Sequence, residues 1–390
     1  MLFFIRKDDS MIDYLIVGGG IIGTFIAREL SHYDVSVTLL EKEKDLAQVQ
    51  TTHNSALVHS PVVITPDKGY FKSKFALEGN KMQRDLVEKF DIPALKTGAY
   101  LLAMNDEEFQ KAKEMAEGAK ARGVDEVCIL SGDAMRKEEP NISQHVVGGL
   151  FMQSAMTVDT YTLVKRVASN ATINGVTINT GEQVTSITHN DDKSFTVHTN
   201  KHTTYTTRYI INAAGVKNAL VASMIEKQVP YTMIPRRGDY FAIKNPRDTP
   251  LSKITLYPIP GNVTKGVLII PQPNETVLIG PTAKEQTSLY NNQVHKKGLE
   301  EIKKDAKRLL QNIPYQNTLH TYAGIRSSID KKDFYIHASL EHDHFIHVAG
   351  IDSPGVTAAP AIAKYVVNTL LMQKDTLKAK HSFDPYNYKA

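Results

Sequence analysis

The amino-acid sequence predicts an α/β protein of two lobes: a Rossmann-like parallel sheet with helices, and a discontinuous α+β lobe built on an antiparallel sheet. The chain has 390 residues, which is longer than a single hydrophobic core usually supports. It opens with a strand, a glycine turn, a helix and a second strand, the order of a parallel βαβ unit. Between residues 230 and 280 it has short strands separated by prolines, which is typical of antiparallel lobes with many edges and turns.

Hydrophobic spacing predicts the individual elements of the first lobe. The βαβ unit comprises a β-branched strand over residues 12–17, a helix over residues 21–30 and a second strand over residues 35–40. Further elements of this lobe are predicted as helices over residues 72–90, 158–168 and 358–371, with a last strand over residues 345–349.

The second lobe is predicted to interrupt the first. We expect residues 1–92, 156–229 and 321–390 to build the first lobe, and residues 93–155 and 230–320 to build the second. Charged helices are predicted over residues 106–123 and 294–311, and residues 1–10 are interpreted as a dispensable extension before Met11.

Composition excludes several classes of protein. Hydrophobic residues make up 42% and charged residues 23% of the chain, as in ordinary folded proteins. The net charge of +4, with no long basic run, argues against a nucleic-acid partner and is compatible with a small anionic substrate.

The single cysteine, Cys128, excludes an intrachain disulfide and a cysteine-based metal cluster, and we predict no metal site. We expect Cys128 to be a small buried hydrophobic side chain. The apolar start, Met1–Ile5, is too short for a signal peptide or a membrane span. A cytoplasmic protein is therefore expected, with peripheral membrane association left open.

The glycine turn points to dinucleotide binding. Gly18, Gly20 and Gly23 fit G-x-G-x-x-G, which supplies a tight turn, close approach of the backbone to a pyrophosphate, and close helix–strand contact. Glu41 ends the second strand and is the predicted acceptor for ribose hydroxyls; a solvated charge at a strand end is the alternative. A carboxylate there disfavours NADP, but the motif does not separate FAD from NAD.

Segments farther along the chain resemble a known family. They include NSALVHS at residues 54–60, YAGIRSSID at residues 322–330 and AGIDSPGVTAAPAIA at residues 349–363. These segments are similar to D-amino-acid-oxidase-type flavoproteins, and within that superfamily to the short mycoplasmal glycerol-3-phosphate oxidases. The resemblance covers nearly the whole chain from Met11 and implies FAD as the cofactor.

The resemblance also implies which positions contact FAD. In addition to the glycine turn and Glu41, they are Ile22, Gln50, Thr51, Ser55, Ala56, Leu57, Val184, Gly215, Ile351, Asp352 and Thr357. The turn of residues 353–355 leads directly into the start of a helix. This arrangement is expected to bring backbone N–H groups beside the flavin ring.

Oxidation of an alcohol by a flavin requires a base for the hydroxyl proton. Among 14 histidines, the resemblance implies His59 as this base, and an imidazole has a suitable pKa. A structural histidine in the core is the alternative for His59, and His53 is a weaker competitor outside the matching register.

An anionic substrate requires cationic donors. The resemblance implies Lys265 and Arg326 as the anion-binding pair, with Ser55 and Ser353 as further substrate contacts. Arg236 and Arg237 are alternatives for anion binding, or else tie their strand to a carboxylate such as Asp239 or Asp352.

The resemblance implies oxidation of sn-glycerol 3-phosphate to dihydroxyacetone phosphate, with O2 reduced to H2O2. A 2-hydroxyglutarate or amino-acid oxidase or dehydrogenase is the first alternative. A weakly active flavin-containing binding protein is the second, because Ala56 and Pro61 stand where the family usually has glycine. Whether O2 or a quinone accepts the electrons is left open.

Overall fold

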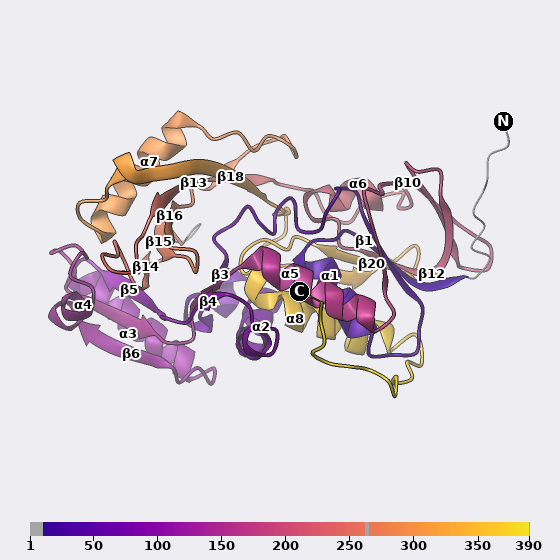
Figure 1. The fold of residues 1–390 in the computed structure, drawn as a ribbon, viewed down its shortest axis with the longest axis horizontal. Coiled ribbons are helices and arrows are strands. Elements are labelled where there is room, and N and C mark those ends of the chain that lie inside the picture. The colour runs from indigo at the N-terminus through magenta and orange to yellow at the C-terminus, as the bar shows by residue number, and fades with distance from the viewer. Residues whose placement is uncertain (1–10, 262–264, 390) are drawn as a thin grey trace.

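The computed structural model describes residues 11–261 and 265–389, so the extension predicted over residues 1–10 lies outside the described residues. Figure 1 shows two lobes side by side, each built on a large sheet. A small third sheet, to which β3 and β4 belong, lies between them. Within the described ranges, no helix combines the length and the apolarity needed to cross a membrane.

The eight-stranded sheet has the order β10-β11-β12-β1-β2-β9, with β20 beside β12 and β19 beside β20. Its centre is parallel, because β12, β1, β2 and β9 run in one direction and β20 pairs with β12 in the same sense. The bounds of its strands are β1 (Ile12–Val17), β2 (Val37–Glu41), β9 (Thr177–Thr180), β10 (Val184–His189), β11 (Phe195–Thr199), β12 (Thr204–Asn212), β19 (Tyr335–Ala338) and β20 (Phe345–Ala349).

Helices cover this sheet and supply most of its core. Helix α1 packs between α5 and α8, and α2 packs along α8. The strand β1 is buried at four consecutive positions, from Tyr14 to Val17, as expected for a strand covered on both faces. The helices of this lobe are α1 (Ile21–Leu30), α2 (Tyr70–Lys89), α5 (Thr160–Ile173), α6 (Asn218–Ala222) and α8 (Gly355–Tyr365).

The nine-stranded sheet has the order β17-β13-β16-β15-β14-β5-β7-β6. Strands β16 and β17 pair with one edge of β13, and β18 pairs with the opposite edge. The sheet is antiparallel except where β14 meets β5 in parallel, since this is where the two separate chain segments of the lobe join. Its strands are β5 (Ala99–Ala103), β6 (Val127–Ser131), β7 (Gly148–Met152), β13 (Arg236–Lys244), β14 (Thr255–Pro258), β15 (Leu268–Pro271), β16 (Thr276–Gly280), β17 (Lys284–Glu285) and β18 (Thr318–Arg326). Its helices are α3 (Asp106–Lys120), α4 (Gly132–Glu138) and α7 (Lys296–Leu309).

The third sheet lies where the chain crosses between the lobes. It consists of β3 (Leu57–Val58), β8 (Met156–Val158) and β4 (Ala94–Leu95), with β8 in the middle. The Thr157 hydroxyl donates to the Pro271 carbonyl at 2.8 Å, which ties this sheet to the end of β15.

Some sequence-based expectations need correction. The boundary expected between residues 320 and 321 falls inside β18, which stays paired with β13 as far as Arg326. Cys128 is exposed rather than buried, because β6 is the edge strand of its sheet. The helix expected over residues 358–371 begins at Gly355 and changes after Tyr365 into a π-helical turn, Val366–Leu371.

Candidate active site

A cavity of about 1360 Å³ opens between the two large sheets. Its walls include the glycine turn after β1, the loop between β20 and α8, and the end of β18. All the predicted site residues line this cavity except Gly23, Ala56 and Thr357. The tertiary structure therefore gathers segments from the whole length of the chain at one place.

The glycine turn is sterically constrained at the positions of the motif. Gly18 has φ +114°, and a Cβ there would stand 2.6 Å from the Ala213 carbonyl oxygen. A Cβ on Gly23 would stand 1.9 Å from the Gly18 carbonyl oxygen. Gly23 therefore brings α1 against the turn instead of facing the cavity, as helix–strand contact requires.

Glu41 is held in a fixed orientation at the end of β2. Its Oε2 accepts from the Gly19 backbone N–H at 2.7 Å and its Oε1 from that of Glu43 at 2.8 Å. The side chain is buried, with 8% exposure, so the alternative of a solvated charge is wrong. Each oxygen keeps a further lone pair, which suits it to accept from ribose hydroxyls.

The cavity has the features that a dinucleotide requires. Helices α1 and α8 both begin at it, and the residues that precede them, Gly20 and Pro354, provide no side-chain cap, so the N-terminal ends of the two helix dipoles favour an anion there. Gln50 Oε1 accepts from the Val216 backbone N–H at 3.0 Å, and Gly215 has φ +59° beside it. Thr51 Oγ1 accepts from the Ile21 N–H at 3.0 Å. These residues fit the ADP half of FAD.

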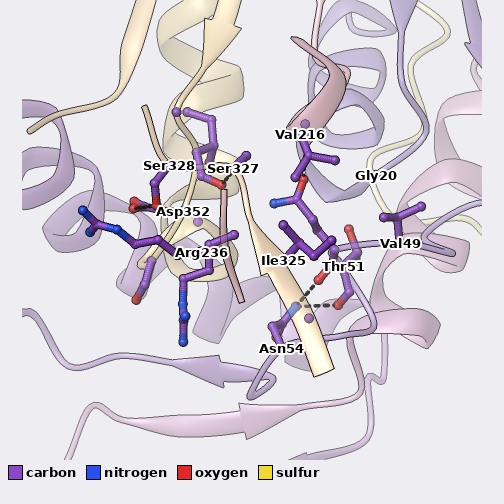
Figure 2. A pocket seen from close by; sticks show the side chains of 18 of the residues that line it. Gly20, Val49, Thr51, Asn54, Val216, Arg236, Ile325, Ser327, Ser328 and Asp352 are labelled. Carbon is purple, nitrogen blue, oxygen red and sulfur yellow. Dashed lines mark hydrogen bonds between the residues drawn. The ribbon is translucent and has the colours of Figure 1, made fainter. Parts of the chain in front are cut away.

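Figure 2 shows the two sides of the cavity. Thr51 and Asn54 lie together on one side, whereas Ser328 and Asp352 meet on the other. Asp352 accepts from the Ser328 hydroxyl at 2.8 Å and forms an ion pair with Lys72 at 2.8 Å. The ion pair between Asp352 and Lys72 therefore fixes the loop that precedes α8 to the first turn of α2.

His59 lines the cavity and is 6% exposed. Its Nδ1 is 2.7 Å from the Tyr257 hydroxyl, and its Nε2 is 3.1 Å from Ser353 Oγ and 3.4 Å from Lys265 Nζ. Its backbone N–H donates to Thr357 Oγ1 at 2.9 Å. Thr357 thus holds the main chain of His59 and does not line the cavity.

The electrostatics of this cluster keep the imidazole neutral. Burial, with a smaller contribution from the Lys265 ammonium, holds the pKa of His59 well below its usual 6.5. Burial also lowers the pKa of Lys265 to about 7, although nearby Asp352 opposes the shift. At neutral pH the site therefore combines an uncharged imidazole with a lysine that titrates close to that pH.

Arg326 lies where β18 leaves the nine-stranded sheet. Both of its Nη atoms donate to the Thr282 carbonyl, at 3.2 and 3.3 Å. On the neighbouring β13, a Cβ on Gly238 would stand 2.9 Å from Arg326 Nη2. Gly238 therefore leaves the space that the guanidinium occupies.

Sequence reasoning missed Tyr240 and Tyr257. Tyr240 lines the cavity together with Arg326 and Ser55, and it stacks on Tyr322 with a centroid distance of 4.8 Å. Alternate residues of a strand share a face. Tyr240 comes two residues after Gly238, so this spacing could have indicated that the two residues face the same side of the strand. Nothing in the sequence near Tyr257 indicates that its hydroxyl reaches His59.

The alternative residues have other partners. His53 also lines the cavity, but its Nδ1 lies 2.7 Å from the Val49 carbonyl oxygen. Arg236 pairs with Glu285 at 2.8 Å, and the buried Arg237 pairs with Asp239 at 3.2 Å. The structural interpretation of Arg237, as a tie to a carboxylate of its own strand, is therefore correct.

The two departures from the family pattern have local explanations. Ala56 has φ +53°, a conformation that glycine adopts with less strain. Its backbone N–H donates to Asn54 Oδ1 at 2.6 Å, which holds the turn. Pro61 begins the short 3-10 helix Pro61–Val63 after Ser60, a position that suits its fixed φ.

Comparison with known proteins decides the family. A family model described as FAD dependent oxidoreductase matches residues 13–369. The chain belongs to this family. Its cofactor is FAD, in agreement with the glycine turn, Glu41 and the two helix starts at the cavity.

Similar proteins cover nearly the whole chain. A "Glycerol 3-phosphate dehydrogenase" of Caloramator mitchellensis is 33% identical over 96% of this chain and 77% of its own length. A "Glycerol 3-phosphate oxidase" of Mycoplasma genitalium is 31% identical over 97% of this chain and 98% of its own. The FAD-bound L-alpha-glycerophosphate oxidase structure from Mycoplasma pneumoniae aligns with a TM-score of 0.90 at 28% identity, covering 98% of this chain and 99% of that one.

Proposed function

We propose that this chain oxidises sn-glycerol 3-phosphate to dihydroxyacetone phosphate, with O2 as the electron acceptor and H2O2 as the second product. The observation that carries the proposal is the position of the His59 imidazole, whose Nε2 lies 3.4 Å from Lys265 Nζ in the cavity that Arg326 also lines. A proton acceptor and two cationic donors suit an alcohol that carries a phosphate. The names of the similar proteins support the same substrate.

In this proposal each residue has one role. Lys265 and Arg326 bind the phosphate, the latter while the Thr282 carbonyl orients its guanidinium. Ser353, which is 3.1 Å from His59 Nε2, and Ser55 orient the substrate hydroxyl. His59 Nε2 takes the hydroxyl proton as the carbonyl of the product forms.

Bound FAD supplies a hydride acceptor for the hydrogen on the alcohol carbon. Glu41, Gln50, Thr51, Val184 and Gly215 are proposed to hold its ADP half. Ile351 and Asp352 are proposed to contact its ring from the loop before α8. Overall, the alcohol loses two hydrogens and O2 gains them as H2O2.

A substrate panel tests the proposal. Holoenzyme is mixed anaerobically with sn-glycerol 3-phosphate, 2-hydroxyglutarate or glycine, and bleaching of the flavin is followed by stopped flow. We expect reduction by sn-glycerol 3-phosphate and little by the others. Reduction by 2-hydroxyglutarate or glycine alone would reassign the substrate, and no reduction by any of them would favour the flavin-containing binding protein.

The electron acceptor needs a second measurement. Reduced enzyme is mixed with O2 or with a soluble quinone, and peroxide is quantified. We expect rapid reoxidation by O2 with one peroxide per turnover. Slow reaction with O2 and fast reaction with the quinone would make the chain a dehydrogenase.

A further inference from the structure

We propose that Tyr257 is a positioning residue, whose hydroxyl accepts the Nδ1 proton of His59 and so keeps the Nε2 lone pair directed at the substrate. Tyr257 belongs to β14, is fully buried, and has its hydroxyl 2.7 Å from His59 Nδ1. The inference deepens the proposed function and rests on the role of His59 as the proton acceptor.

The donors around Nε2 determine which imidazole nitrogen carries the proton. Lys265, as an ammonium, can only donate, and it donates to Ser353 Oγ at 2.8 Å. Ser353 Oγ therefore accepts from the lysine and has its own proton available for His59 Nε2, at 3.1 Å. Because Nε2 faces donors, it accepts, and the single proton of the neutral imidazole lies on Nδ1 and points at Tyr257.

The opposite tautomer would prevent catalysis. If Tyr257 donated to Nδ1, the proton of the imidazole would lie on Nε2, between Ser353 and Lys265 and facing the substrate hydroxyl. An Nε2–H group cannot accept a proton from an alcohol. The direction of the Tyr257–His59 hydrogen bond therefore decides whether His59 is a base.

A phenol differs from the carboxylate that orients histidine in a Ser-His-Asp triad. Burial raises the pKa of Tyr257, so the phenol remains neutral. A neutral acceptor fixes the ring and the tautomer without stabilising the imidazolium as an anion would. This arrangement is compatible with the strongly lowered pKa of His59, because the nearest ionisable cation, Lys265, opposes protonation.

The structure assigns the Tyr257 hydroxyl no other partner. Within residues 11–261 and 265–389, its one hydrogen bond is the bond to His59. The ring packs in the apolar core of the nine-stranded lobe with Leu101 and Leu268. Replacement by phenylalanine therefore removes the hydroxyl and leaves the packing volume in place.

Tyr257→Phe is the direct test. In anaerobic stopped flow with sn-glycerol 3-phosphate, we expect the limiting rate of flavin reduction to fall by about 10- to 100-fold, part of a typical general-base contribution. The substrate dissociation constant and the FAD content should stay unchanged, because Lys265 and Arg326 are untouched. Weaker substrate binding or lost FAD, in proportion to the rate, would indicate a structural role and overturn the proposal.

Two controls separate the effect from general damage. Tyr14→Phe removes another buried hydroxyl, which bonds to Asp375 at 3.3 Å outside the cavity, and should leave the reduction rate unchanged. In a His59→Asn background, Tyr257→Phe should cause no further loss of rate, because the two side chains act as one unit. An additive loss would mean that Tyr257 acts without His59.

A spectroscopic measurement keeps the inference distinct from the proposed function. Nitrogen-15 NMR of histidine-labelled holoenzyme, with His59 assigned by comparison with His59→Asn, reports the tautomer without any substrate. We expect the Nδ1–H form in the wild type and a shift toward Nε2–H in Tyr257→Phe. An Nε2–H wild type, or an unchanged variant, would overturn the positioning role even if sn-glycerol 3-phosphate proves to be the substrate. The expected tautomers without any reduction by sn-glycerol 3-phosphate would sustain the positioning role and reject only the substrate.

Discussion

His59, Lys265 and Ser353 come from three distant segments of the chain, yet their polar atoms lie within hydrogen-bond distance of one another. His59 is buried and Lys265 is half-buried, so the protonation of each depends on its neighbours. The result is a neutral imidazole beside a lysine whose pKa is lowered to about 7. Single substitutions in this cluster should therefore change chemistry and substrate binding separately.

The first residue-scale prediction concerns the base. His59→Asn should retain FAD and lower the rate of flavin reduction by about 100-fold or more, as loss of a general base does. His53→Asn is the matched control, since His53 lines the same cavity but bonds to the Val49 carbonyl. Stopped-flow reduction measures both. Full activity in His59→Asn, or an equal loss in His53→Asn, would assign the base elsewhere.

The second residue-scale prediction concerns binding of the substrate's phosphate group by Arg326. Arg326→Leu should raise the dissociation constant of sn-glycerol 3-phosphate about tenfold or more, because a hydrogen bond to a charged group is worth about 1.5–3 kcal/mol, while FAD stays bound. Arg84→Leu, which removes an arginine paired with Glu126 at the surface, should change nothing. Titration of flavin absorbance measures the constant. An unchanged value in Arg326→Leu would remove this arginine from the anion site.

The third follows from the lowered pKa of Lys265. The ammonium form, present below a pKa of about 7, is the form that attracts a phosphate. The apparent substrate constant should therefore rise as the pH is raised through 7 toward 9, while the base stays neutral because the pKa of His59 lies well below 6.5. A pH series of kcat/KM measures this, and Lys265→Arg should flatten it. A profile that rises through this window would contradict the assignment.

At the scale of elements, the site depends on where helices begin. Helices α1 and α8 start at the cavity without a cap from the side chain of the preceding residue. The N–H groups of Ile21 and Gly355 are already bonded within the protein, so the other N–H groups of each first turn remain for the cofactor. The start of α1 is fixed by Gly23, which touches the turn at Gly18. The two helices pack against each other, so both N-termini are held in one rigid unit.

Two glycine substitutions test this dependence. Gly23→Ala should abolish FAD retention, because the added Cβ would stand 1.9 Å from the Gly18 carbonyl oxygen. Gly118→Ala, in α3, meets nothing within 4 Å and should stabilise the protein by up to about 1 kcal/mol through helix propensity. Bound flavin and urea unfolding measure the two effects. A Gly23→Ala protein with full FAD would show that the turn tolerates a side chain.

At the scale of the molecule, one lobe is proposed to bind the cofactor and the other to bind the phosphate of the substrate. The residues proposed to hold FAD belong to the eight-stranded lobe and to the crossing segment that includes β3. Lys265 and Arg326 belong to the nine-stranded lobe, next to β15 and at the end of β18. Catalysis should therefore require both lobes, whereas cofactor binding should stabilise the molecule without substrate.

FAD linkage tests the whole-molecule interpretation. At about 100 times its dissociation constant, FAD should raise the free energy of unfolding of the apoprotein by about 2.7 kcal/mol, because it binds the folded state alone. Urea unfolding followed by circular dichroism measures the change. NAD at the same concentration is the control and should have a much smaller effect. Equal stabilisation by NAD would contradict selectivity for FAD.

The parts of this protein that sequence could predict are local or patterned. The glycine turn, Glu41 and the strand over residues 345–349 follow from spacing within one unit, and the family follows from segments along most of the chain. Element ends and the boundary near residue 320 were less accurate, because pairing of β18 with β13 as far as Arg326 depends on a neighbouring strand. The roles of the predicted site residues stay predictions.

By itself, the sequence determined the fold class, the FAD-dependent family and the dinucleotide turn, because these depend on residue order and short-range sterics. Only the tertiary structure decided which side chains meet His59. Tyr257 is 198 residues away in the chain, and Tyr240 and Arg326 line the same cavity from two paired strands. Such contacts arise from the packing of two sheets around one cavity, and no local pattern in the sequence encodes their distance or their direction.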